Sequence, residues 1–312
     1  MYFIYDIINL VIKMNKVIIT ADSGVNPIKK DENIIPALIN SSSGITYNDG
    51  EISNKEILER SKKGEIFKTS SPTLGSFEDV FKRNLNDNKE IIHLCMSSGI
   101  SSGSYQGALT MKNILDENDK KISIFDTLQG GQGGTILYEV ATNLAKKGIE
   151  RKEIIKILTD IRDRMITSFL VPNPEGFIRS GRDKSHLKKL DQLKLTYVKF
   201  KVRAGFKFKV NMENGNLYNS GNFKCKDNIF EPIVKELINE DSINNYDSKY
   251  VVIGNVFEKQ VDMNKIIQYI KSFNYFENVI RKDPSATVAA YGCDDLCGIS
   301  LVKKINNNNQ DY

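Results

Sequence analysis

A short run of serines and glycines stands out because its side chains and its backbone can both bind an anion. Residues 97–104 read SSGISSGS, after the apolar run 91–95 and before a segment with a helical pattern, 105–111. This order predicts a buried strand, a tight loop and a helix start. Serine hydroxyls, backbone N–H groups beside glycine and a helix N-terminus all favour negative charge. The stretch predicts a cradle for a carboxylate or phosphate, although the same residues also suit a turn that only caps the helix.

Polar side chains follow other predicted strands as well. The apolar segment 16–21 ends at Asp22, and the segment 121–125 ends at Asp126, which a glycine-rich loop follows. A second hydroxyl-rich stretch, FKTSSPT at residues 67–73, reads as a loop at a strand end. We expect Asp22 and Asp126 to accept hydrogen bonds there rather than to bind a metal. Ligands of open parallel sheets bind at the carboxyl ends of the strands, so these loops predict a site along one sheet edge.

The order of predicted elements divides the chain into two domains. Strands alternate with helices over residues 15–167, which predicts an α/β domain with a Rossmann-like parallel sheet flanked by helices. Residues 168–312 predict an α+β domain with antiparallel strands, because 197–202 and 206–211 alternate in polarity and a turn is expected at 213–215. Residues 1–14 are treated as an extension outside the fold prediction.

The overall composition excludes some classes of function. The 312 residues carry 44 basic and 39 acidic side chains, for a net charge of +5. No basic stripe is interleaved with aromatics, so we do not expect a nucleic-acid partner. The apolar run at residues 1–13 is too short to span a bilayer, and it lacks the basic start and the cleavage site of a signal peptide. We therefore expect no membrane span.

The four cysteines do not predict a metal site. Cys95 ends an apolar strand, which predicts a core position, and Cys225, Cys293 and Cys297 have no fourth ligand near them in the sequence. A reduced, cytoplasmic chain without metal or other cofactor is the expectation.

Five motifs follow one another in the order of a known family. They are VIITADS at residues 17–23, TSSPT at 69–73, SSGISSGSYQ at 97–106, the Asp126-Thr127 strand end with its glycine loop, and Ser180-Gly181-Arg182. In this order they resemble the DegV family, which includes the fatty-acid-binding subunit of bacterial fatty acid kinase.

The resemblance implies a carrier without catalytic activity of its own. A long-chain fatty acid would lie between the two domains, and a fatty acid kinase subunit is a possible partner. The carboxylate would meet hydroxyls from two neighbouring loops. The implied ligand-binding residues are Thr69, Ser70, Ser97, Ser98, Ser101, Asp126 and Arg182.

One segment departs from the family pattern. Many members carry a histidine near the C-terminus in a Gly-x-His-x-Gly stretch, close to the carboxylate. The corresponding residues 290–298 read AYGCDDLCG and contain no histidine. Asp294 and Asp295 stand there instead, and acidic side chains near a carboxylate would repel it.

Two glycine-containing segments suggest enzymatic alternatives to a carrier. Residues 99–103 match the Gly-x-Ser-x-Gly elbow of serine hydrolases, with Ser101 as nucleophile. A triad needs a histidine base, and the chain has only His93, inside an apolar strand, and His186, in a lysine-rich segment. The glycine loop 130–134 lacks the lysine and the spacing of nucleotide-binding loops, so chain geometry explains it better.

Overall fold

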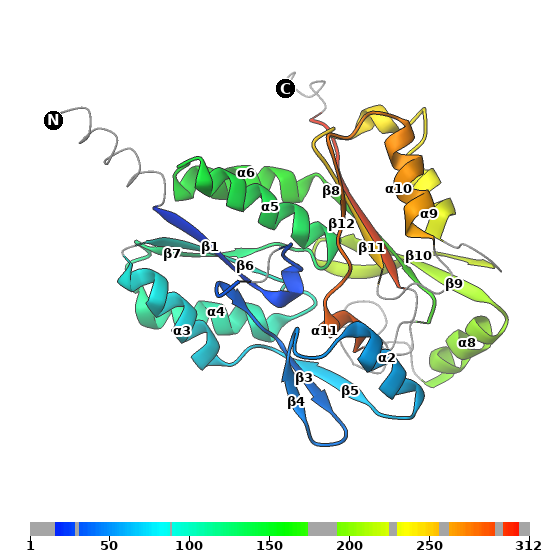
Figure 1. Cartoon of the computed structure of the whole chain (residues 1–312), viewed down its shortest axis with the longest axis horizontal. Helices are drawn as coiled ribbons and strands as arrows, with labels where there is room; N and C mark the ends of the chain where they lie inside the picture. The colour runs from blue at the N-terminus through cyan, green and yellow to red at the C-terminus, as the bar shows by residue number, and fades with distance from the viewer. Residues whose placement is uncertain are drawn as a thin grey trace.

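The computed structural model describes most of the chain and shows three sheets with helices between and around them (Figure 1). The described residues are 16–28, 31–87, 89–173, 192–224, 230–255, 262–290 and 296–305.

The N-terminal part is built on a four-stranded parallel sheet. Its order is β2-β1-β6-β7, and every pair in it is parallel. Two helices cover each face (Figure 1), because a parallel connection must cross over the sheet. The strands are β1 (Val17–Asp22), β2 (Ile34–Ile35), β6 (Glu90–Cys95) and β7 (Ile122–Asp126), with α3 (Leu74–Asn86) and α4 (Ser102–Leu115) on one face and α5 (Gln132–Lys146) and α6 (Arg151–Asp163) on the other. The predicted α/β architecture is confirmed.

The second sheet has six strands and is mostly antiparallel, which confirms the predicted α+β architecture of the C-terminal part. Its order is β10-β9-β8-β13-β11-β12, and only the β11–β12 pair is parallel. Helices α9 (Phe230–Leu237) and α10 (Met263–Ser272) pack on its outer face (Figure 1). The strands are β8 (Met165–Val171), β9 (Phe206–Glu213), β10 (Asn216–Lys224), β11 (Tyr250–Asn255), β12 (Asn278–Arg281) and β13 (Cys297–Val302).

Helix α5 joins the two large sheets. It packs against β1 of the parallel sheet and against β8, β11 and β13 of the other. One apolar cluster accordingly contains Val17 from β1, Ile136 from α5 and Val252 from β11. The predicted domain boundary between residues 167 and 168 lies within β8 and stays a prediction.

A small antiparallel sheet was not predicted from the sequence. It consists of β3 (Leu38–Ser41), β4 (Thr46–Asn48) and β5 (Phe67–Ser70), in the order β4-β3-β5. Pro36 separates β2 from β3, because it cannot donate a ladder hydrogen bond, and the chain changes sheets there. Residues 67–70, which we expected in a loop, form β5, one of its two edge strands.

One further segment forms a helix where a strand was expected. Residues 197–202 belong to α8 (Gln192–Arg203). A short helix near the C-terminal end, α11, spans Ala286–Ala289. Gly205, at φ 82°, follows the end of α8 in the way that glycines end helices. The predicted turn at 213–215 is confirmed and joins β9 to β10.

Helix α5 packs closely against the turn that follows β1, and Gly134 allows this close approach. A Cβ on Gly134 would lie 2.3 Å from the carbonyl oxygen of Val25. Because both groups belong to the backbone, Gly134→Ala is expected to lower the free energy of unfolding by about 2 kcal/mol in urea titrations. Gly75→Ala is the matched control, since its Cβ would meet nothing closer than 3.8 Å. Equal stability of the two variants would contradict this packing.

Candidate ligand-binding site

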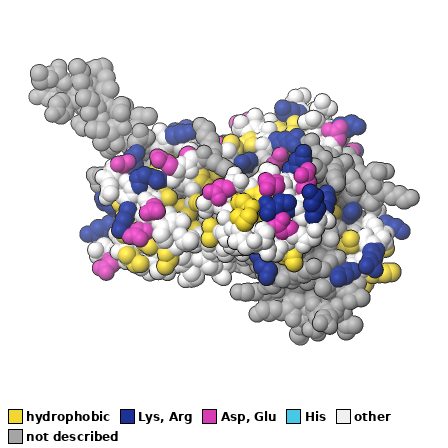
Figure 2. Space-filling view, turned by 60° about the horizontal axis from the view of Figure 1, so that its bottom comes forward, with side chains coloured by type: hydrophobic (Ala, Val, Ile, Leu, Met, Phe, Trp, Pro, Cys, Tyr) yellow, Lys and Arg dark blue, Asp and Glu magenta, His cyan; other side chains and the backbone are white. Residues whose placement is uncertain are grey.

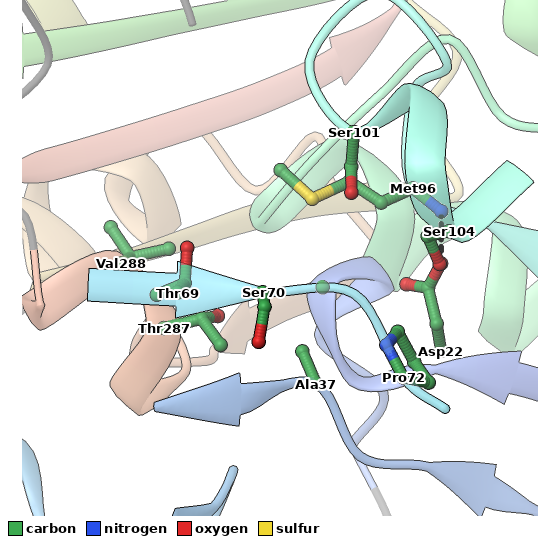
Figure 3. Close-up of a pocket in the computed structure, with 11 residues that line it drawn as sticks. Asp22, Ala37, Thr69, Ser70, Pro72, Met96, Ser101, Ser104, Thr287 and Val288 are labelled. Atoms are coloured by element: carbon green, nitrogen blue, oxygen red, sulfur yellow. Dashed lines mark hydrogen bonds between the residues drawn. The ribbon is translucent and has the colours of Figure 1, made fainter. Parts of the chain in front are cut away.

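A pocket lies where the small sheet meets the end of the parallel sheet (Figure 3). It encloses about 400 Å³, counting the part open to solvent. Its walls come from the end of β1, from β5, from the segment between β6 and α4, and from α11. The lining residues are Asp22, Gly24, Ala37, Thr69, Ser70, Pro72, Met96, Ser101, Ser104, Thr287 and Val288.

The N-terminus of α4 supplies one wall of the pocket. Ser101 is the N-cap residue of this 14-residue helix, yet its side chain makes no capping hydrogen bond. Its backbone, at φ −129° and ψ 67°, holds the side chain at the pocket instead (Figure 3). The hydroxyl and the positive end of the helix dipole together favour an anionic group at this position.

Strand β5 supplies another wall, and its Thr69 and Ser70 side chains point to opposite sides of the strand (Figure 3). Thr69 and Ser70 are its last residues and pair with Ile39 and Leu38 of β3. The Ser70 hydroxyl accepts a hydrogen bond from Asn40 Nδ2 at 3.1 Å. These side chains therefore belong to a regular strand, and the strand-end loop expected for them is wrong. A strand fixes their positions more firmly than a loop does.

Asp22 places a carboxyl group in the pocket wall. Only 2% of the residue is exposed. Its Oδ2 accepts hydrogen bonds from the Ser104 hydroxyl at 2.7 Å and from the Met96 backbone N–H at 2.9 Å. Burial raises the pKa of Asp22 to about 6, and these hydrogen bonds limit the rise. The pocket thus contains an acidic group that gains a proton near neutral pH.

Three predicted site residues lie outside this pocket lining and hold loops together. The buried Ser97 hydroxyl donates to the carbonyl oxygen of Gly215 in the β9–β10 turn at 2.5 Å. Asp126 Oδ1 accepts from the backbone N–H groups of Ser98 at 3.2 Å and Leu128 at 3.0 Å. The structure therefore brings Thr69, Ser70 and Ser101 together and gives Ser97, Ser98 and Asp126 loop contacts. Arg182, Asp294 and Asp295 lie outside the described residues.

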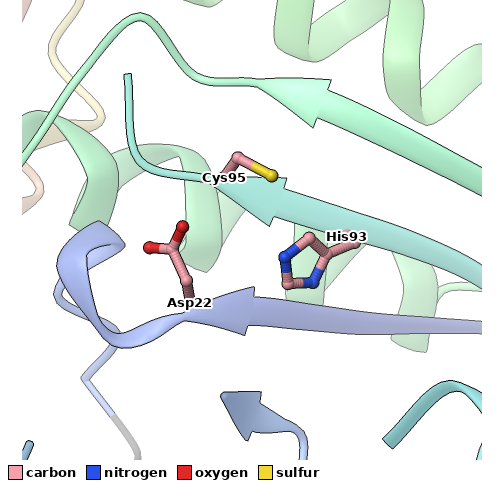
Figure 4. A group of neighbouring side chains, drawn as sticks. All are labelled: Asp22, His93 and Cys95. Carbon is pink, nitrogen blue, oxygen red and sulfur yellow. The ribbon is translucent and has the colours of Figure 1, made fainter. Parts of the chain in front are cut away.

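A second polar cluster is buried at the parallel sheet (Figure 4). His93 contacts rings from α3, and Asp22 accepts a hydrogen bond from Ser104 of α4. Potential ligand atoms of Asp22, His93 and Cys95 lie within 4.8 Å of one another, and by type they could hold a metal ion. However, His93 Nδ1 is 2.9 Å from the Thr20 hydroxyl, and burial raises the pKa of the Cys95 thiol. A protonated thiol is a poor metal ligand and one imidazole nitrogen is already engaged, which favours a hydrogen-bonded polar cluster over a metal site.

His93 is also unsuited to act as a catalytic base. Its ring is completely buried and contacts the rings of Phe77 and Phe81 at 5.5 and 5.3 Å between centroids. Burial lowers its pKa to about 3, so it stays neutral at physiological pH. With one ring nitrogen at Thr20, this side chain does not activate Ser101. His186, the other candidate base, lies outside the described residues.

The family model described as "Uncharacterised protein, DegV family" matches residues 20–304. The chain belongs to the DegV family. It is 32% identical to the DegV domain-containing protein YteA of Lactococcus lactis over 139 residues, which are 44% of this chain and 48% of that protein. A DegV domain-containing protein of Streptococcus pyogenes is 35% identical over 142 residues, with the same shares of 44% and 48%. The chain thus spans about half the length of the curated relatives it matches.

Solved DegV structures share the whole fold at low identity. A DegV protein of Thermus thermophilus, described for its fatty acid binding, has a TM-score of 0.75 at 18% identity and covers 93% of this chain and 100% of its own. The DegV fatty acid binding protein of Bacillus subtilis has a TM-score of 0.74 at 20% identity, and the match covers 93% of this chain and 99% of that protein. The Fatty Acid Kinase (Fak) B3 protein of Streptococcus pneumoniae, solved with linoleic acid, has a TM-score of 0.72 at 16% identity. The match covers 93% of this chain and 100% of that protein.

Sequence reasoning missed several pocket residues. Asp22 and Ser104 were seen as a strand end and a loop serine, but nothing local indicates that they hydrogen bond across 82 positions. Thr287 and Val288 reach the pocket through α11, a helix of four residues whose segment reads as a strand. The serine run was the available signal for the α4 side of the site.

Proposed function

We propose that this DegV-family protein binds a long-chain fatty acid, with the carboxylate at the N-terminus of α4. The observation that carries the proposal is a pocket whose lining combines Ser101, at an uncapped helix start, with Thr69 and Ser70 of β5. Each hydrogen bond to a charged carboxylate contributes about 1.5–3 kcal/mol. The Thr69 and Ser101 hydroxyls and a helix start therefore suit one carboxylate, and Ser70 lines the pocket beside them.

The acyl chain has an apolar region next to this pocket. Val288 lines the pocket and also packs against a buried cluster between the small sheet, α2 (Asn54–Lys62) and the six-stranded sheet. We infer that the chain enters by displacing these contacts near Val288. Burial of fifteen methylenes is worth roughly 12 kcal/mol before ordering costs, at about 0.8 kcal/mol each. The cluster contains Ile39, Ile52, Ile57, Leu58, Phe67, Val171, Val198, Phe208, Ala286, Ala289, Ala290 and Leu296.

A carrier role without catalysis agrees with the side chains around Ser101. The described pocket lining contains no histidine, lysine or arginine that could act as a base or bind an oxyanion. The shared fold with the Streptococcus pneumoniae Fatty Acid Kinase (Fak) B3 protein makes a kinase subunit the proposed partner. No described helix is long and apolar enough to cross a membrane. A cytoplasmic location is part of the proposal.

Equilibrium binding to delipidated protein tests this function. We expect oleate to displace a fluorescent fatty acid from the protein with an affinity in the micromolar range or tighter, which corresponds to about 8 kcal/mol or more. Methyl oleate is the matched control ligand, because it keeps the acyl chain and removes the charge. Equal affinities for the two ligands would contradict the placement of the carboxylate, and failure of both to bind would contradict the function.

A further inference from the structure

A buried acid is an unexpected neighbour for a ligand carboxylate. Asp22 lines the proposed site, and its Oδ2 is already occupied by Ser104 and Met96. Its Oδ1 has no hydrogen-bond partner among the described residues, although the backbone N–H groups of Gly24 and Val25 lie near enough to lower the pKa of the carboxyl. One oxygen of a carboxyl group that lines the pocket is therefore left for a further contact.

The groups that surround Asp22 offer little to balance a second negative charge. From β6, His93 is held neutral and Cys95 is held as the thiol, because burial disfavours their charged forms. Asp126 on β7 adds a further negative charge beside Cys95, and Tyr105 on α4 is neutral below its raised pKa. The parts of β5, α11 and the Ser23–Val25 turn (η1) that reach the pocket carry no titratable side chain.

We propose that Asp22 makes acyl binding proton-linked, because it takes up a proton from solvent when a fatty-acid carboxylate occupies the pocket. This inference rests on the proposed fatty-acid binding. When it is protonated, Asp22 no longer repels the ligand, and its free oxygen can become a hydrogen-bond donor to it. Because the pKa of the empty protein's Asp22 is already about 6, the proton is acquired close to neutral pH. A nearby carboxylate raises that pKa further, and each unit of the rise strengthens binding tenfold in acid.

The experiment measures oleate affinity of the full chain between pH 5.5 and pH 8, with oleyl alcohol as the uncharged ligand. For the wild type we expect oleate affinity to rise about tenfold from pH 8 to pH 5.5, and oleyl alcohol affinity to stay constant. Asp22→Asn is expected to bind oleate with an affinity that varies less than twofold over this range. Asp116→Asn is the matched control, because Asp116 accepts backbone N–H groups at the far end of α4 and should keep the wild-type profile.

Calorimetry in buffers of different ionisation enthalpy gives the proton count directly. Near pH 7 we expect wild-type protein to take up between a half and one proton for each oleate bound, and Asp22→Asn to take up none. If the asparagine variant does not fold, Ser104→Ala replaces it. Loss of the Ser104 hydrogen bond removes a contact that lowers the pKa of Asp22, so the pH midpoint should move upward.

The possible failures are distinguishable. Oleate binding that does not change with pH in the wild type, or a pH profile that survives in Asp22→Asn, would overturn the proton linkage and leave fatty-acid binding intact. An unmoved midpoint in Ser104→Ala would overturn it as well. The absence of oleate binding at every pH would instead overturn the proposed function on which the inference rests.

Discussion

Oleate binding is expected to weaken about 100-fold when Thr69→Val and Ser101→Ala are combined. The two residues belong to different elements, Thr69 to the end of β5 and Ser101 to the start of α4, and both line the pocket. Each hydrogen bond to a carboxylate contributes about 1.5 kcal/mol at the lower end of its range, so removal of two costs about 3 kcal/mol. The replacements are nearly isosteric, which leaves the acyl-chain region unchanged. Displacement of a fluorescent fatty acid measures the effect.

The matched control makes the same chemical changes away from the pocket. Thr110→Val with Ser272→Ala removes two exposed hydroxyls that donate to helix carbonyls, and oleate affinity should stay within twofold of the wild type. Ser98→Ala adds a sharper comparison. The family resemblance implies Ser98 at the carboxylate, whereas in the structure its backbone N–H donates to Asp126. A large loss in Ser98→Ala with none in the double variant would contradict the pocket assignment.

Acid is expected to destabilise the protein through His93. Burial lowers the folded-state pKa of His93 to about 3 from its ordinary value of 6.5, so the folded protein holds the ring neutral. This contribution to stability is present above pH 6.5 and is lost as the pH falls towards 3. From pH 7 to pH 5 the loss is about 2 kcal/mol. Urea unfolding of wild type and His93→Gln measures it, since glutamine can accept from Thr20 and does not titrate.

Asp22 should change stability in the opposite direction over the same pH range. Its folded-state pKa is raised to about 6, so its contribution is present below the unfolded-state value of 3.8 and is lost as the pH rises through about 6. From pH 7 to pH 5 the folded protein gains about 1 kcal/mol from this group. The loss of unfolding free energy from pH 7 to pH 5 should therefore be smaller in His93→Gln than in wild type. In Asp22→Asn it should be larger than in wild type. The reverse order would contradict both assignments.

Elements with a strong local pattern were predictable from the sequence. The strands that became β1, β6 and β7 are short apolar runs that end in polar loops, and parallel pairing follows from the helices between them. Helix α8 was missed because apolar and polar residues alternate near Tyr197 over six residues, as they do in a strand. Six residues are too few to distinguish the strand period of 2 from the helix period of 3.6.

The site was only half predictable for a related reason. The α4 side comes from one continuous serine run, so its chemistry is visible in the sequence. The β5 and α11 sides depend on pairing between residues far apart, such as Leu38 with Ser70, and on Thr287 from near the end of the chain. Asp22 shows the same limit, because its buried position beside Ser104 follows from the packing of α4 on the sheet and not from any local pattern.

The most direct test of the central claim is mass spectrometry of the purified full chain under non-denaturing conditions, followed by organic extraction and identification of any released lipid. We expect a complex heavier than the 35.3 kDa chain by the mass of one long-chain fatty acid, and recovery of that acid in a molar ratio near one. A protein that carries no acyl chain, and that still carries none after incubation with oleate, would contradict the account.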